Sequence, residues 1–175
     1  MIIVISIIMI LLGIAMFPYG YYMQRWYTER AADGLAQEWV LAHKAIRWGL
    51  EFDPIARTHA RLFFVFEKGT SEIQSYLLSG SVLPDLDNLT TTDIIEYKKF
   101  TMENGVQILG FSGSIAQTET RVGYLISPPY GDGIFFTGSI VSGSTLTGAR
   151  IIIGYPGADT TTGRAREILV RTYLK

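Results

Sequence analysis

The sequence predicts an α+β fold in which one long N-terminal helix precedes a domain of short antiparallel strands. Residues 1–23 contain no charged side chain, and helical periodicity continues beyond them to about residue 50. Aromatic and β-branched runs then alternate with turn-forming Gly, Pro and Asn. We therefore expect three parts: a transmembrane or filament-core helix over 1–23, an amphipathic continuation over 24–52, and a β-rich globular domain over 53–175.

The first part is apolar enough to enter a membrane. Residues 1–17 are interrupted only by Ser6 and Gly13, and the first charged residue is Arg25. At a rise of about 1.5 Å per residue, a helix over this stretch approaches the thickness of a hydrocarbon layer of about 30 Å.

Four interpretations of this stretch compete. A cleaved signal peptide is disfavoured, because no basic residue precedes Ile2 and 15–17 is a poor cleavage site. A buried core helix would need a larger domain around it. A simple single-pass anchor fits, except that Arg25 and Arg30 would keep the remainder in the cytoplasm by the positive-inside rule. The fourth interpretation is a helix that serves first as an anchor and then as a packing element in a filament.

The second part has one apolar face. Leu35, Trp39, Ala42 and Ile46 follow each other at steps of four, three and four, which places them on one side of a helix. This pattern predicts a helix lying on a sheet and ending near residues 49–52, because the residue that precedes Pro54 is biased away from helical geometry. We expect a solvated or capping role for His43, and packing or interface roles for the three tryptophans.

The third part reads as strands separated by turns. Residues 59–69 predict a strand buried on both faces, 71–78 a short helix or a strand, and 80–92 a loop. Asn104-Gly105 favours a type I′ turn, so 94–113 is expected to form a hairpin. Further strands are expected over 121–126, 133–139, 149–155 and 165–173.

Composition and motifs favour a structural role over catalysis. The chain has 175 residues and a net charge of −1, so it is not a globally basic nucleic-acid binder, and it has no cysteine for disulfides or thiolate metal sites. Its two histidines, His43 and His59, have no metal-binding spacing, and no Gly-x-Ser-x-Gly elbow is present. We expect no enzyme activity and no cofactor.

The N-terminal helix carries a resemblance to a known family. The run VISIIMILLGIAMFPYGYYMQR, followed by a long amphipathic helix, resembles the N-terminal helix of type IV pilins and type II secretion pseudopilins. Pro18 corresponds to the proline that those helices carry within the apolar part. A proline removes one backbone N–H and clashes with the carbonyl four residues earlier, so a kink is expected there, helped by Gly13 and Gly20.

Two further stretches resemble one branch of that family. Residues 35–46 and the Gly163-Arg164-Ala165-Arg166 entry into the last strand are similar to the H-type minor pseudopilins and the fimbrial T minor pilins. The basic leader, the Gly before the cleavage point, the aromatic first mature residue and the Glu at mature position five are not in this sequence. The register places Met1 just after that Glu, so the resemblance implies that these features precede Met1.

The resemblance implies a structural subunit of a type IV pilus, competence or type II secretion filament. Such a subunit is held in the inner membrane by a single pass, with its globular domain extracytoplasmic, and then joins a surface or periplasmic filament. Its implied partners are other pilin or pseudopilin subunits through the N-terminal helix, membrane lipid, a prepilin peptidase and the assembly platform.

Two alternatives stay open. A DNA-binding minor pilin for DNA uptake would use the C-terminal cations Arg164, Arg166, Arg171 and Lys175, because clustered cations neutralise phosphates. The same alternation of cations with apolar residues also describes an ordinary strand with one solvated face. The other alternative is a membrane-tethered extracytoplasmic β domain that never polymerises.

Overall fold

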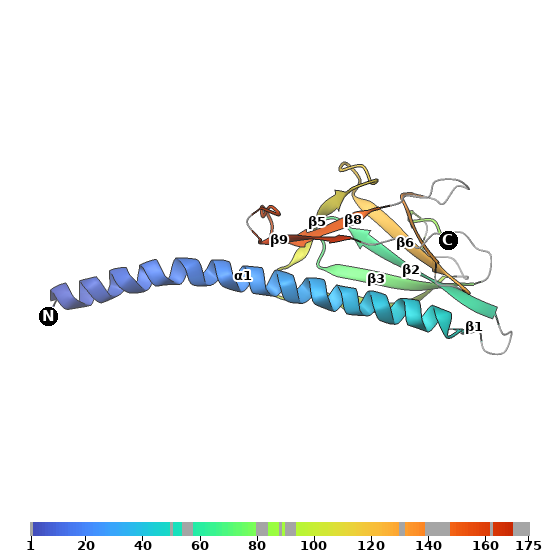
Figure 1. Ribbon diagram of the computed structural model, residues 1–175, viewed down its shortest axis with the longest axis horizontal. Helices are drawn as coiled ribbons and strands as arrows, with labels where there is room; N and C mark the ends of the chain where they lie inside the picture. Colours follow the sequence, from blue (N-terminus) through green and yellow to red (C-terminus); the bar gives the residue numbers. More distant parts are fainter. Residues whose placement is uncertain are drawn as a thin grey trace.

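The computed structural model describes residues 2–49, 51–53, 58–79, 84–87, 89, 94–129, 132–138, 148–161 and 163–169. Among these residues one helix, α1 (Ile2–Arg47), runs along most of the length of the molecule, and the β domain lies against one side of its second half (Figure 1). The predicted α+β architecture is confirmed. The described strands are β1 (Glu51–Asp53), β2 (Thr58–Glu67), β3 (Glu72–Ser79), β4 (Ile94–Thr101), β5 (Gln107–Ser112), β6 (Arg121–Ser127), β7 (Asp132–Phe136), β8 (Arg150–Gly154) and β9 (Ala165–Leu169).

The strands form two antiparallel sheets. The larger sheet has the order β4-β3-β2-β6-β7, with β1 paired to β2 outside this path, and the smaller sheet has the order β5-β8-β9. Strand β2 is central, pairing with β3 on one side and β6 on the other. Residues 71–78, which the sequence left open between helix and strand, are therefore part of a strand.

The two faces of β2 enter two separate hydrophobic clusters. Leu62, Phe64 and Phe66 face a large cluster that also contains residues of α1 and of the smaller sheet. Phe63 and Val65 point to the opposite face, where a smaller cluster is closed by Leu86 and other side chains. This alternation with a period of two confirms the prediction of a strand buried on both faces.

The second half of α1 packs on the larger cluster by the face predicted from sequence. Leu35 and Ile46 are each 1% exposed, and Ala42 is buried beside them. The helix ends at Arg47, two residues before the predicted range, and Gly49 follows with a positive φ of 83°. Glycine adopts this conformation without a steric penalty, so it suits a helix C-terminus.

The expected hairpin over 94–113 is wrong in its pairing, although its turn is present. Asn104 and Gly105 have positive φ of 59° and 78°, as a type I′ turn requires. However, β4 pairs with β3, and β5 pairs with β8 in the other sheet. The amide of Ile108 donates to the Thr70 carbonyl (2.9 Å), and its carbonyl accepts from the Gly69 amide (2.7 Å). The β2–β3 turn thus holds β5 and directs the chain into the second sheet.

Candidate functional site

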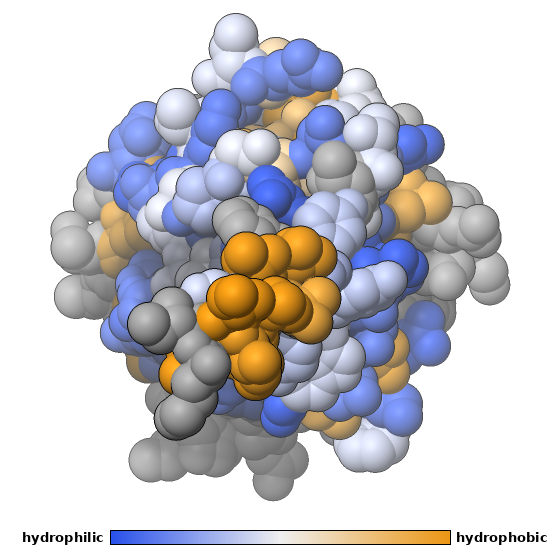
Figure 2. Space-filling model, turned by 90° about the vertical axis from the view of Figure 1, so that its left-hand side faces the viewer, coloured by the Kyte–Doolittle hydropathy of each residue, from blue (hydrophilic) through white to orange (hydrophobic). Residues whose placement is uncertain are grey.

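The apolar half of α1 is uncovered by the rest of the described chain. Its large side chains from Ile3 to Met16 are each 51–74% exposed, and Figure 2, which looks at the N-terminal side of the molecule, shows them as a hydrophobic cluster standing out from a more polar surface. Removing these side chains from water is worth roughly 10–20 kcal/mol when each contributes about 1.5–3 kcal/mol and part of each is already covered. The helix is long and apolar enough to span a membrane.

The three residues predicted to loosen the helix all lie within it. Helix α1 is continuous through Gly13, Pro18 and Gly20, and Figure 1 shows a shallow bow along its length. A methyl group added at Gly13 or Gly20 would meet nothing within 4 Å in this chain. Both glycines therefore leave open notches on the helix surface that a neighbouring molecule can occupy.

Aromatic and cationic residues follow the apolar run. Tyr19 and Tyr22 are 65% and 66% exposed, and Trp26 is 49% exposed. The Arg30 guanidinium lies 5.5 Å from the Trp26 ring centroid, so it points back toward the N-terminal half of the helix. Such a sequence of aromatic side chains and then cations is typical of the boundary between a hydrocarbon layer and water.

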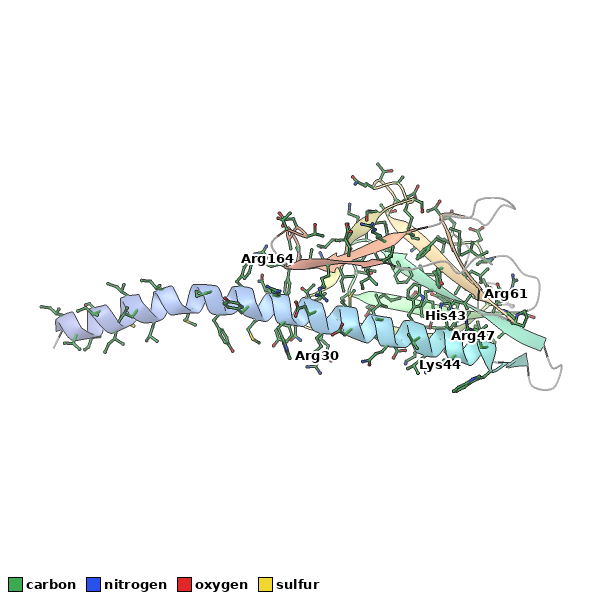
Figure 3. All side chains as sticks on the ribbon, viewed as in Figure 1. Arg30, His43, Lys44, Arg47, Arg61 and Arg164 are labelled. Carbon is green, nitrogen blue, oxygen red and sulfur yellow. The ribbon has the colours of Figure 1, made fainter. Side chains whose placement is uncertain are left out.

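The end of the β domain nearest the apolar half is fixed to the helix at this level. The buried hydroxyl of Thr28 lies 2.9 Å from the Gln24 carbonyl oxygen and 3.2 Å from that of Arg164, and donates its proton to these two acceptors. The Arg164 guanidinium lies 5.9 Å from the Tyr21 ring centroid. Arg164 precedes β9, so the last described strand is attached to the helix where the apolar run ends. Figure 3 shows Arg164 at this edge of the domain and His43, Lys44, Arg47 and Arg61 at the other.

A glycine allows this attachment. Gly154 pairs with Ala165 across β8 and β9. A Cβ on Gly154 would overlap the Arg164 carbonyl oxygen, which is the acceptor for Thr28. The next residue, Tyr155, donates its hydroxyl to the Asn104 carbonyl (2.7 Å), and burial raises the pKa of this phenol. Two hydrogen bonds thus hold the β8–β9 connection in place: Thr28 of the helix donates to one end, and Tyr155 at the other end donates to the β4–β5 turn.

The described candidates for DNA binding are engaged with the helix. Arg166 lies 3.8 Å from Glu29, which also accepts from Arg25 at 3.3 Å, and Arg164 stacks on Tyr21 as described above. Arg171 and Lys175 lie outside the described residues. The arrangement brings the first pair of predicted cations to the helix junction, where one carboxylate compensates part of the charge.

His43 and Trp39 belong to an aromatic cluster between helix and sheet. Trp39 lies between the rings of Phe64, Phe66 and Tyr124, at centroid distances of 5.4, 5.5 and 4.4 Å. His43 Nε2 lies 3.2 Å from the Tyr124 hydroxyl. The histidine is therefore half-buried against the sheet rather than solvated or capping, because the phenol of Tyr124 offers it a hydrogen-bond partner. Sequence spacing predicted the packing of Trp39 but gave no signal for the contact between His43 and Tyr124.

Among the described residues, no group of three His, Cys, Asp or Glu side chains is placed to hold a metal ion. The features that the sequence and structure bring together are an uncovered apolar helix and a cationic, aromatic junction at the base of the β domain. No family model, no curated protein and no solved structure matches this chain.

Proposed function

We propose that this chain is a membrane-anchored filament subunit, a minor pilin or pseudopilin of a type IV pilus, competence or type II secretion machine. The observation that supports it most is the division of one continuous 46-residue helix into an uncovered apolar half and a half that carries the β domain. In a filament the apolar halves bundle at the centre and the β domains face outward.

The physical chemistry of transfer from membrane to filament supports this assignment. Lipid tails cover the apolar half before assembly, and neighbouring helices cover it afterwards, so assembly exposes little apolar surface to water. Helices in such surroundings associate through close packing and small residues. Gly13 and Gly20, at which an added methyl group would meet nothing in this chain, provide two places for close approach.

The first experiment tests the pilin class. The gene is expressed with its own upstream codons, with and without a prepilin peptidase, and the N-terminus of the product is determined by mass spectrometry. We expect cleavage before an aromatic residue only when the peptidase is present. A product of unchanged mass in both cases would contradict the proposal.

The second experiment tests filament formation and uses the absence of cysteine from the chain. An Ile8→Cys variant places one thiol in the apolar half, where the native side chain is 51% exposed. We expect an oxidant to produce disulfide-linked oligomers in cells that contain the assembly machinery, because packed helices bring Cα atoms within the roughly 4.4–6.8 Å that a disulfide needs.

Its matched control is Thr118→Cys, an exposed position in the connection between β5 and β6. In Figure 1 this connection lies on the side of the domain away from the helix. We expect no oligomers from this variant. A protein that stays in the membrane but crosslinks at neither position would instead be a tethered β domain that does not polymerise.

A further inference from the structure

We infer that the junction between α1 and the β domain is a binding surface for anionic lipid headgroups. We call this surface the collar and define it as Arg25, Arg30, Arg164 and Arg166 with the aromatic residues Tyr19, Tyr21, Tyr22 and Trp26. The inference rests on the membrane anchoring within the proposed function, and it does not require filament assembly.

The position of the collar along the helix matches a headgroup layer. Residues 3–22 span about 30 Å as a helix, which is the thickness of a hydrocarbon core. The Cα atom of Arg25 lies about 4.5 Å further along the axis. Headgroups add about 5–8 Å on each side of the core, so Arg25 falls within this layer.

Two more cations reach the same layer through contacts with aromatic rings. The Cα atom of Arg30 lies about 12 Å beyond residue 22, but its guanidinium stacks on Trp26, one turn nearer to the membrane. Arg164, which is far away in sequence, stacks on Tyr21. Both guanidinium groups are thus held at the level of the interfacial aromatic side chains.

The collar carries excess positive charge. Glu29 pairs with Arg25 at 3.3 Å and lies 3.8 Å from Arg166. Within the described residues Arg30 and Arg164 form no ion pair. Asp33 and Glu103 also line the hollows beside Arg30. Four arginines against these three carboxylates leave a net positive charge, which attracts anionic headgroups electrostatically.

The β domain contributes to this surface by its fold. Arg164 and Arg166 flank Ala165, which pairs closely with Gly154, and the Thr28 hydroxyl donates to the Arg164 carbonyl. The β8–β9 connection also contains Asp159, whose carboxylate accepts from the Thr161 hydroxyl at 2.8 Å. Lipid binding at the collar therefore fixes the height and tilt of the β domain on the bilayer as well as the depth of the helix.

The test measures which lipids surround the protein. The full chain with Thr160→Cys, an exposed position in the β8–β9 connection, is labelled with a fluorescent donor and placed in phosphatidylcholine vesicles. These contain equal, small amounts of headgroup-labelled acceptor, either phosphatidylglycerol or phosphatidylcholine. We expect a local enrichment of the anionic acceptor of about two- to fivefold, decreasing as salt is raised.

Charge variants assign the enrichment to the collar. Arg30→Gln combined with Arg164→Gln should reduce the enrichment to nearly one. Arg30→Lys with Arg164→Lys should keep most of it, because the charge remains. Arg150→Gln is the matched control, since Arg150 already pairs with Glu167 at 2.8 Å. Circular dichroism of each variant checks that the β domain is folded.

Three outcomes of these measurements would overturn the collar inference alone. One is equal energy transfer from the two acceptors in the native chain. Another is the same loss in the Lys and Gln variants, which would make the arginines packing residues. The third is binding of duplex DNA to the protein in neutral vesicles, abolished by the Gln variants, with no lipid preference. Release of the chain by alkaline carbonate would overturn anchoring and collar together, whereas failed processing or crosslinking would overturn only the filament proposal.

Discussion

Replacing Trp39 by Ala should weaken the packing of the helix on the sheet. The ring of Trp39 lies 4.4 Å from that of Tyr124, and the rings of Phe64 and Phe66 lie at 5.4 and 5.5 Å. Truncation of a fully buried aromatic residue costs about 3–5 kcal/mol, including the lost aromatic pairing. Because Trp39 is only partly buried, we expect about 2–4 kcal/mol. With a urea dependence of about 1.5–2 kcal/mol per molar, the unfolding midpoint should fall by roughly 1–2.5 M.

The assay is urea unfolding of the full chain in detergent micelles, followed by near-ultraviolet circular dichroism of the packed aromatic side chains. Val40→Ala is the control, because Val40 is the next residue and is 52% exposed. It should shift the midpoint by less than about 0.5 M. Equal shifts for the two variants would refute the idea that the face containing Trp39 attaches the domain to the helix.

Three further predictions concern the β domain. Gly154→Ala should destabilise this domain by about 1–3 kcal/mol in the same urea assay, because the new Cβ overlaps the Arg164 carbonyl oxygen. Gly110→Ala is the control and should have little effect, because a Cβ added there meets no atom within 4 Å. Thr28→Val should speed amide hydrogen exchange in β9 about fivefold through loss of roughly 1 kcal/mol of hydrogen bonding, and Thr28→Ser should restore the native rate. Burial raises the pKa of Tyr76 above 10.0, so the folded state favours the neutral phenol. The unfolded state loses this proton at a lower pH than the folded state, so the melting temperature should decline as pH rises above about 10. Tyr76→Phe should lessen that decline.

The sequence predicted the burial of side chains correctly where one periodic pattern determines which face of a helix or strand is apolar. Leu35 and Ile46 repeat with helical spacing, so their burial follows from the position of a core on one side of the helix. The run through Phe63 and Phe64 is apolar on both faces, and the structure supplies one cluster for each face. In both cases the local pattern and the tertiary packing demand the same arrangement.

The partner of each strand could not be predicted in the same way. Asn104-Gly105 determines the local turn, but the next strand is directed by hydrogen bonds between Ile108 and the Gly69-Thr70 turn. Those residues are about forty positions apart, and none of them has an unusual composition around it. A turn dipeptide therefore predicts a reversal of the chain without predicting which sheet the following strand enters.

Local sequence patterns also could not predict the junction between α1 and the β domain. Thr28 is a polar residue within a helix, and Arg164 immediately precedes a strand, so each has an ordinary explanation on its own. Their contact spans 136 residues and depends on Gly154 allowing a close approach. The cationic C-terminal pattern drew attention to Arg164 and Arg166, but only the fold places them beside Glu29 and Tyr21.

The contact between Thr28 and Arg164 sets an order of events during synthesis of the protein. At a translation rate of about 5–20 residues per second, roughly 7–27 s separate the emergence of these two residues. During this time the apolar half of the helix can already be in the membrane, while the apolar face around Leu35 is not yet covered by all of the strands. In the proposed membrane-anchored subunit, the helix would therefore enter the membrane before the β domain is complete.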